Sequence, residues 1–154
     1  MLSANILELH AKTIAPTPLR AFILEDMPAR VDAFKRVLSE AGVEVCWATN
    51  VEAAKRLWAP PYKIALLDHD LEDADYNYWT MAAAIDGDGT GYDFVKWLSK
   101  RDAGNEQRPL MILHSYNFDG ARRMTNGLRE AGFEAIQWPF ANDLLEFLKI
   151  VVEK

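Results

Sequence analysis

Residues 19–26 read LRAFILED, an apolar run of strand length that ends abruptly in two acids, Glu25 and Asp26. A strand that is apolar throughout, rather than at alternate positions, is typical of a parallel sheet covered on both faces. Further apolar runs of similar length lie at about residues 43–48, 64–67, 110–113 and 134–137. The sequence therefore predicts five buried strands, the first of which ends in a pair of carboxylates.

Segments with helical spacing separate these runs. The clearest helix is predicted over residues 29–41, with Pro28 in its first turn, Asp26 or Met27 as its cap and Gly42 just past its end. The other helices are expected near residues 51–58, 91–101, 118–131 and 142–152. Strict alternation of strands and helices predicts a doubly wound α/β domain built on a five-stranded parallel sheet.

Length and composition limit the possible classes of protein. A chain of 154 residues, 50% of them hydrophobic, is long enough for one sizeable core, so we expect an N-terminal extension over residues 1–18 and one domain over residues 19–154. The net charge of -6 argues against general nucleic-acid binding. We see neither a secretion signal nor an apolar run long enough to span a membrane, and we expect a cytoplasmic location.

Polar residues follow the predicted strands at the edge where ligands bind in open parallel sheets. These residues are Glu25 and Asp26 after the first strand, Asp68, His69 and Asp70 after the third, and His114 and Ser115 after the fourth. Three carboxylates in one cleft repel one another unless one is protonated or a cation lies among them. Mg²⁺ (or Mn²⁺) suits Glu25, Asp26 and Asp68, since it binds a few carboxylates and keeps waters that a phosphate can replace. The simpler alternative is that Asp26 only caps a helix and Asp68 only begins a turn.

Several of these residues occur in the order found in response-regulator receiver (CheY-like) domains. They are Leu24-Glu25-Asp26, Arg30, Leu67-Asp68, Gly91 at the start of the third helix, Ser115 and Pro139-Phe140. The resemblance covers about residues 19–152 and implies the flavodoxin-like strand order 2-1-3-4-5, with a cis peptide bond before Pro139. It also implies that Glu25 and Asp26 hold magnesium, that Asp68 accepts a phosphoryl group and that Ser115 binds its oxygens.

The sequence departs from the receiver pattern in three places, of which the third is the placement of two histidines beside the predicted site. Receivers carry a lysine immediately before the proline that follows the fifth strand, and this chain has Trp138 there. Arg122 or Arg123 could supply the missing charge only if the fourth helix turned it inward. An insertion at about residues 70–89 contains several acids and the aromatic cluster at 76–79, which could stack on a base, close the pocket or simply cover an apolar patch of the domain.

Two histidines stand beside the predicted site, His69 next to the aspartate and His114 next to the serine. Each could bind the metal, act as a general acid or serve a structural role. The combination of Asp68-His69-Asp70-Leu71, Thr90-Gly91 and His114-Ser115 resembles the receiver branch named for cyclic-phosphate processing.

Three functions remain as hypotheses. The first is a metal-dependent phosphoesterase for a cyclic or terminal phosphate, with Asp68, His69 and His114 as catalytic residues and Ser115 on the phosphate. The second is a signalling receiver phosphorylated on Asp68, against which Trp138 counts most. The third is a pseudo-receiver without chemistry. The partner is accordingly a small phosphorylated ligand or a protein signalling partner.

Overall fold

The computed structural model describes residues 19–71, 76–77, 82–83, 89–101 and 108–153. The N-terminal extension and most of the insertion lie outside these residues. Within the insertion the structure places two short antiparallel strands, β4 (Tyr76–Asn77) and β5 (Ala82–Ala83). The predicted roles of the aromatic cluster therefore stay predictions.

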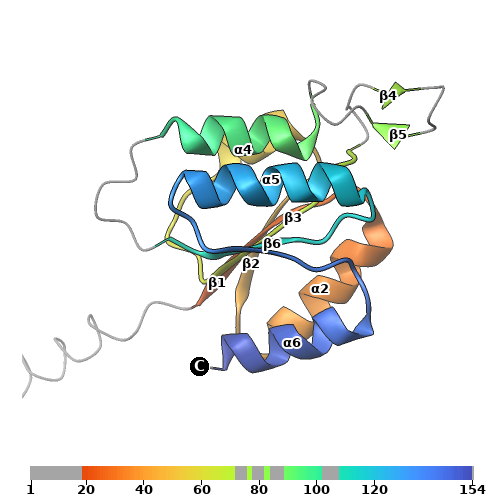
Figure 1. Cartoon of the computed structure of the whole chain (residues 1–154). Helices are drawn as coiled ribbons and strands as arrows, with labels where there is room; N and C mark the ends of the chain where they lie inside the picture. The colour runs from red at the N-terminus through yellow and green to blue at the C-terminus, as the bar shows by residue number, and fades with distance from the viewer. Residues whose placement is uncertain (1–18, 72–75, 78–81, 84–88, 102–107, 154) are drawn as a thin grey trace, which may run out of the picture.

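The central sheet has five parallel strands in the order β2-β1-β3-β6-β7 (Figure 1). Their bounds are β1 Arg20–Leu24, β2 Glu44–Ala48, β3 Ile64–Leu67, β6 Leu110–Leu113 and β7 Ala135–Gln137. When these five strands are counted along the chain, the order is 2-1-3-4-5. The predicted doubly wound sheet and its strand order are confirmed.

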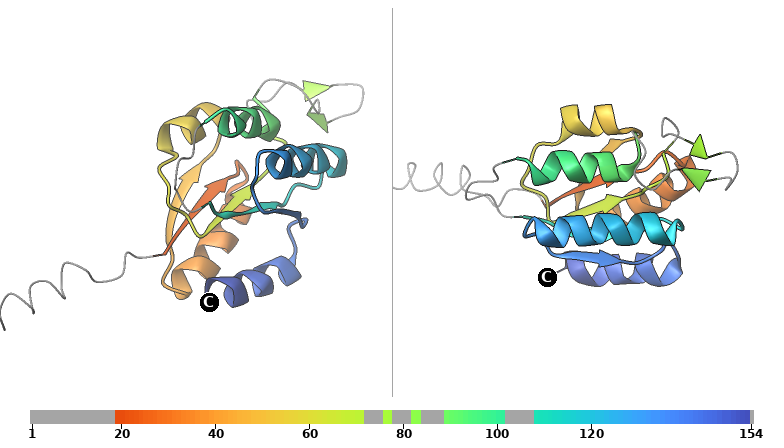
Figure 2. Two further views of the ribbon diagram at one scale, coloured as in Figure 1. Left: turned by 60° about the vertical axis from the view of Figure 1, so that its left-hand side comes forward. Right: turned by 45° about the horizontal axis from the view of Figure 1, so that its top comes forward.

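Five helices cover the two faces of this sheet. They are α2 (Pro28–Glu40), α3 (Val51–Leu57), α4 (Gly91–Ser99), α5 (Phe118–Glu130) and α6 (Asn142–Val152), each close to its predicted bounds. Helices α2 and α6 pack together on one face, and α3, α4 and α5 lie on the other (Figures 1 and 2). Among the described residues, none of the helices has the length and apolar character needed to cross a membrane.

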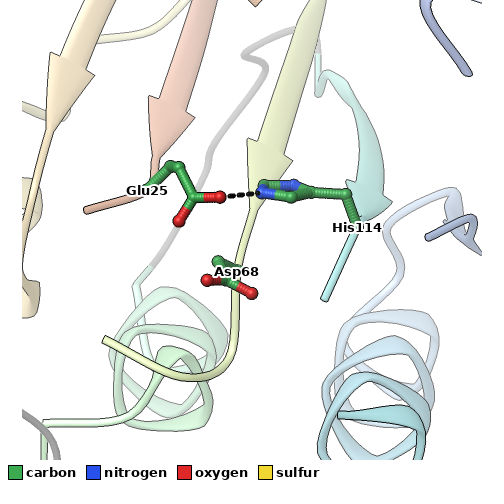
Figure 3. Close-up of side chains that lie close together, drawn as sticks. All are labelled: Glu25, Asp68 and His114. Carbon is green, nitrogen blue, oxygen red and sulfur yellow. Dashed lines mark hydrogen bonds and ion pairs between the residues drawn. The ribbon is translucent and has the colours of Figure 1, made fainter. Parts of the chain in front are cut away.

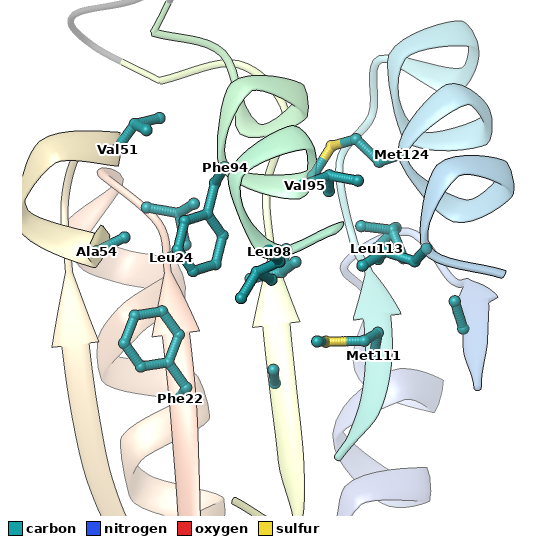
Figure 4. Packing of buried hydrophobic residues seen from close by; sticks show 14 of the residues in the cluster. Phe22, Leu24, Val51, Ala54, Phe94, Val95, Leu98, Met111, Leu113 and Met124 are labelled. Carbon is teal, nitrogen blue, oxygen red and sulfur yellow. The ribbon is translucent and has the colours of Figure 1, made fainter. Parts of the chain in front are cut away.

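The alternation of side chains along each strand divides the core in two. In β1, Phe22 and Leu24 pack on the side of α3, α4 and α5, where Phe94 stacks on Phe22 (Figure 4). Ala21 and Ile23 of the same strand pack on the side of α2 and α6. This alternation determines which face receives each polar residue that follows a strand.

Gly91 allows α4 to begin directly against the end of β3. A Cβ atom at this position would lie 2.0 Å from the backbone oxygen of Asp68 and 2.7 Å from Cε of Met124. The amide of Gly91 also donates a hydrogen bond to the backbone oxygen of His69, over 2.8 Å. Only glycine fits this close approach of helix to strand.

We expect Gly91→Ala to destabilise the fold by about 1–3 kcal/mol or more, because the new methyl group meets backbone rather than a movable side chain. Gly127→Ala in α5 is the matched control, since its Cβ would meet Cγ1 of Val95 at 3.3 Å. That contact is relieved by a small side-chain movement, and alanine favours helix by about 1 kcal/mol over glycine. Urea unfolding measures both variants, and equal midpoints for the two would contradict the role given to Gly91.

The expected cis peptide bond before Pro139 is wrong. The cis bond found in the described residues joins Pro60 and Pro61, and the bond between Trp138 and Pro139 is trans. The segment after β7 stays extended beside the end of β6, with the amide of Trp138 donating to Leu113 and that of Phe140 to His114. The trans form is the ordinary state of most bonds to proline in folded proteins.

Candidate functional site

Three buried polar side chains meet at the carboxyl edge of the sheet. Glu25, Asp68 and His114 are the first residues after β1, β3 and β6, and each offers a ligand atom within 4.8 Å of the other two (Figure 3). Their exposed fractions are 0%, 3% and 0%. The structure thus brings together two of the predicted metal ligands and one of the predicted catalytic histidines.

His114 contacts Glu25 directly. Its Nε2 lies 3.3 Å from Oε1 of the glutamate, and its ring meets that of Phe34 edge-on at 5.0 Å between centroids. The other ring nitrogen, Nδ1, is buried without a hydrogen-bond partner. A buried imidazole with an unsatisfied nitrogen is costly, which is typical of a residue kept for function.

Burial sets the charge states of this cluster. It raises the pKa of Asp68 to about 7, against the opposing effect of His114, and it also raises the pKa of Glu25. Burial lowers the pKa of His114 to about 4. Two carboxyl groups that resist ionisation and an uncharged imidazole are a donor set that a divalent cation would stabilise, so these residues fit such an ion.

Arg30 is the cation beside this cluster, and no role could be given to it from the sequence. Its Nη1 lies 3.3 Å from Oε1 of Glu25 and 4.0 Å from Oδ2 of Asp68. The guanidinium lies over the ring of Tyr116, at 4.6 Å from the centroid, and near that of Phe140, at 5.6 Å. No local pattern in the sequence signals these contacts, because they join α2 to the segments that follow β6 and β7.

Asp26 lies outside the group formed by Glu25, Asp68 and His114. It is partly buried, and its amide donates to Oε2 of Glu25 over 3.0 Å. The N-cap position of α2 is Met27, without a side-chain hydrogen bond, so Asp26 is not the cap of this helix.

Ser115 lies next to Asp68. Its side chain is buried, and its Oγ accepts a hydrogen bond from the amide of Asn117 at 3.0 Å. The serine hydroxyl acts to lower the pKa of Asp68, against the larger effect of burial. The serine is therefore close enough to contact a group bound at this aspartate.

His69 packs on the opposite face of the sheet from His114. A Cβ atom on Gly120 of α5 would lie 2.5 Å from its Cγ, so the helix rests directly on the imidazole ring. Its Nδ1 lies 2.5 Å from Oδ1 of Asp70, and Asn117 donates to that same oxygen over 2.9 Å. The two histidines, equivalent in the sequence, therefore have different surroundings.

Position 138, where receivers carry a lysine, holds a tryptophan that packs on the C-terminal helix. Trp138 packs against Phe147, with ring centroids 4.7 Å apart. Arg122 pairs with Asp119 over 3.3 Å, and Arg123 lies over the ring of Tyr92 at 5.0 Å. These arginines contact neighbours on α4 and α5, whereas Arg30 reaches Asp68.

The fold and the acidic residues at the ends of β1 and β3 define a receiver domain. Residues 23–130 match the family model described as the cyclic-phosphate processing receiver domain, and the chain belongs to this family. No curated protein matches the chain.

Solved receiver structures share the fold. The non-phosphorylated HemR receiver domain of Leptospira biflexa is 21% identical, with a TM-score of 0.60, over 88% of this chain and 95% of that one. A CheY-like receiver domain from Methanospirillum hungatei is also 21% identical, with a TM-score of 0.57, over 89% and 95% of the two chains. The Mn²⁺-bound form of response regulator Rcp1 is 14% identical, with a TM-score of 0.57, over 87% of this chain and 91% of that one. At these identities the likeness concerns the fold.

Proposed function

We propose that this protein is a metal-dependent phosphoesterase that processes a cyclic or terminal phosphate ester at the cluster of Glu25, Asp68 and His114. The observation that carries the proposal is the position of His114, an uncharged buried imidazole within 4.8 Å of two buried carboxyl groups. Carboxylates alone suit ion binding, whereas an imidazole beside them adds a group that can move a proton.

Glu25 and Asp68 would hold Mg²⁺ or Mn²⁺ through their carboxylate oxygens. Asp26, which is partly buried and directly follows Glu25, is the third predicted ligand. The bound ion would polarise the phosphoryl group of the ester. Ser115, whose hydroxyl acts to lower the pKa of Asp68, would then donate its hydroxyl to a phosphate oxygen.

His114 would handle the proton of the reacting oxygen. Its lowered pKa keeps the imidazole uncharged, and the contact of Nε2 with Glu25 orients the ring. The imidazole would take a proton from the attacking water as the new P–O bond forms, and it would give that proton to the leaving oxygen as the ester bond breaks. His69 was the second candidate for this role. We assign it the task of fixing the segment after Asp68 against α5, because its ring contacts Gly120 and its Nδ1 contacts Asp70.

Turnover of cyclic phosphodiesters tests this proposal. The protein is incubated with a panel of cyclic phosphodiesters and terminal phosphomonoesters in Mg²⁺, and ³¹P NMR follows the products. We expect cleavage that requires the metal and falls about a hundredfold or more in Asp68→Asn. Asp119→Asn is the control, since Asp119 is 61% exposed in its side chain and lies on α5.

Small-molecule phosphoryl donors belong in the same experiment. Persistent phosphorylation of Asp68 without cleavage of any ester would reject the phosphoesterase and favour signalling. Neither activity would leave the pseudo-receiver, and equal cleavage by wild type and Asp68→Asn would remove the site from these residues.

A further inference from the structure

Arg30 is placed where a ligand's phosphate would meet the carboxyl cluster. We propose that Arg30 binds the phosphoryl oxygens of the ligand, so that the phosphate-binding cation of this protein comes from α2 and not from the segment after β7. The inference rests on the proposed function in one respect, namely that a phosphate binds at Asp68.

Arg30 is a counter-ion of the two acids, Glu25 and Asp68. Its Nη1 approaches Glu25 at 3.3 Å and Asp68 at 4.0 Å, and its side chain is 14% exposed. A divalent cation on the same carboxylate oxygens repels the guanidinium, because two positive charges at such distances in a poorly solvated site oppose each other strongly. Metal binding would therefore release Arg30 from the acids.

The rings of Tyr116 and Phe140 give Arg30 a second set of contacts. The guanidinium lies 4.6 Å from the ring centroid of Tyr116 and 5.6 Å from that of Phe140. The hydroxyl of Tyr116 donates to the backbone oxygen of Phe140, and this hydrogen bond fixes the ring of Tyr116. Cation–π attraction to these rings would keep Arg30 beside the cluster after the acids release it.

The guanidinium of Arg30 carries its N–H groups in a planar fork. That fork matches two oxygens of one phosphate, a geometry that a lysine ammonium does not offer. The other arginines considered from the sequence, Arg122 and Arg123, are paired with Asp119 and Tyr92. Arg30 is thus the arginine that contacts Asp68 in the part of the chain that the structure describes.

The substitution Arg30→Gln separates a phosphate-binding role from a structural one, because it is expected to raise the affinity for metal and to lower the affinity for phosphate. Electron paramagnetic resonance of free Mn²⁺ measures metal affinity, and calorimetry with inorganic phosphate in saturating Mg²⁺ measures anion affinity. We expect Mn²⁺ to bind about tenfold more tightly, since a competing charge is lost. We expect phosphate to bind about tenfold or more weakly, since a charge-assisted pair is lost.

Two further variants serve as controls. Arg30→Lys keeps the charge without the planar fork, so we expect wild-type Mn²⁺ affinity and weaker phosphate binding. Arg123→Gln, at an exposed arginine that lies over the ring of Tyr92, is expected to leave both affinities unchanged. Thermal melts verify that each variant is folded.

The outcomes separate this inference from the proposed function. If no ester is cleaved but the two affinities of Arg30→Gln move in opposite directions, the inference stands and the phosphoesterase falls. If wild type cleaves esters but Arg30→Gln binds phosphate normally, the phosphoesterase stands and the inference about Arg30 falls. A joint loss of both affinities, or no phosphate binding by wild type, overturns the role given to Arg30.

Discussion

His114→Ala is expected to lower kcat for ester cleavage about a hundredfold or more, the usual cost of removing a group that transfers a proton. His69→Ala is expected to retain turnover per folded molecule and to lose about 2–4 kcal/mol of stability. The difference follows from their surroundings. His114 faces Glu25 and Asp68, whereas His69 fills the space against Gly120 and pairs with Asp70.

Steady-state kinetics in saturating Mg²⁺ and urea unfolding of both variants make the comparison. His114→Gln is a useful companion, because it keeps polar atoms in the site but cannot take up a proton near neutral pH. Equal loss of turnover in the two alanine variants at the same folded fraction would contradict the assignment. A kinetic defect confined to His69→Ala would reverse it.

Divalent metal is expected to stabilise the folded protein, and the effect should disappear in Asp68→Asn and Glu25→Gln. A ligand present at about 100 times its Kd adds about 2.7 kcal/mol, which for a domain of this size raises Tm by about 5–10 °C. Each substitution removes one anionic oxygen donor from the cluster. Thermal melts with and without Mg²⁺ or Mn²⁺ measure the shift.

Asp26→Asn distinguishes two arrangements of this metal site. If Asp26 rotates into the site, its substitution also lowers the shift, and if Glu25 and Asp68 suffice, the shift persists. Asp119→Asn is the control, since Asp119 is exposed, pairs with Arg122 and is not part of the cluster. Equal shifts in wild type, Glu25→Gln and Asp68→Asn would place the metal elsewhere.

The fold was predictable because its signals are local. Continuous apolar runs identified the strands, and Pro28 and Gly42 bracketed the first helix. The meeting of Glu25 and Asp68 followed from the rule that polar residues after parallel strands share one edge of the sheet.

The faces occupied by the two histidines were also within reach of the sequence. Leu24, Leu67 and Leu113 pair across β1, β3 and β6, so the residue that follows each of them falls on the same side. That register groups His114 with the acids and sends His69 to the other face. The strand pairing had to be known first, because a shift of one residue in the register of a strand moves its side chains to the other face of the sheet.

The contacts of Arg30 depended on geometry that no local pattern carries. Its approach to Asp68 requires the orientation of α2 against β3, and its contacts with Tyr116 and Phe140 join three separate segments. The expected cis bond before Pro139 was wrong because it was inferred from resemblance alone, and the trans form satisfies the backbone hydrogen bonds of Trp138 and Phe140.

The most direct test of the central claim is anomalous diffraction at the manganese edge from crystals soaked with Mn²⁺ and inorganic phosphate. The account predicts an anomalous peak at coordinating distance, about 2.0–2.2 Å, from carboxylate oxygens of Glu25 and Asp68. It also predicts phosphate density against the ion, within reach of Ser115 and Arg30, and no peak in Asp68→Asn. A peak away from these acids, or one that Asp68→Asn leaves in place, would contradict it.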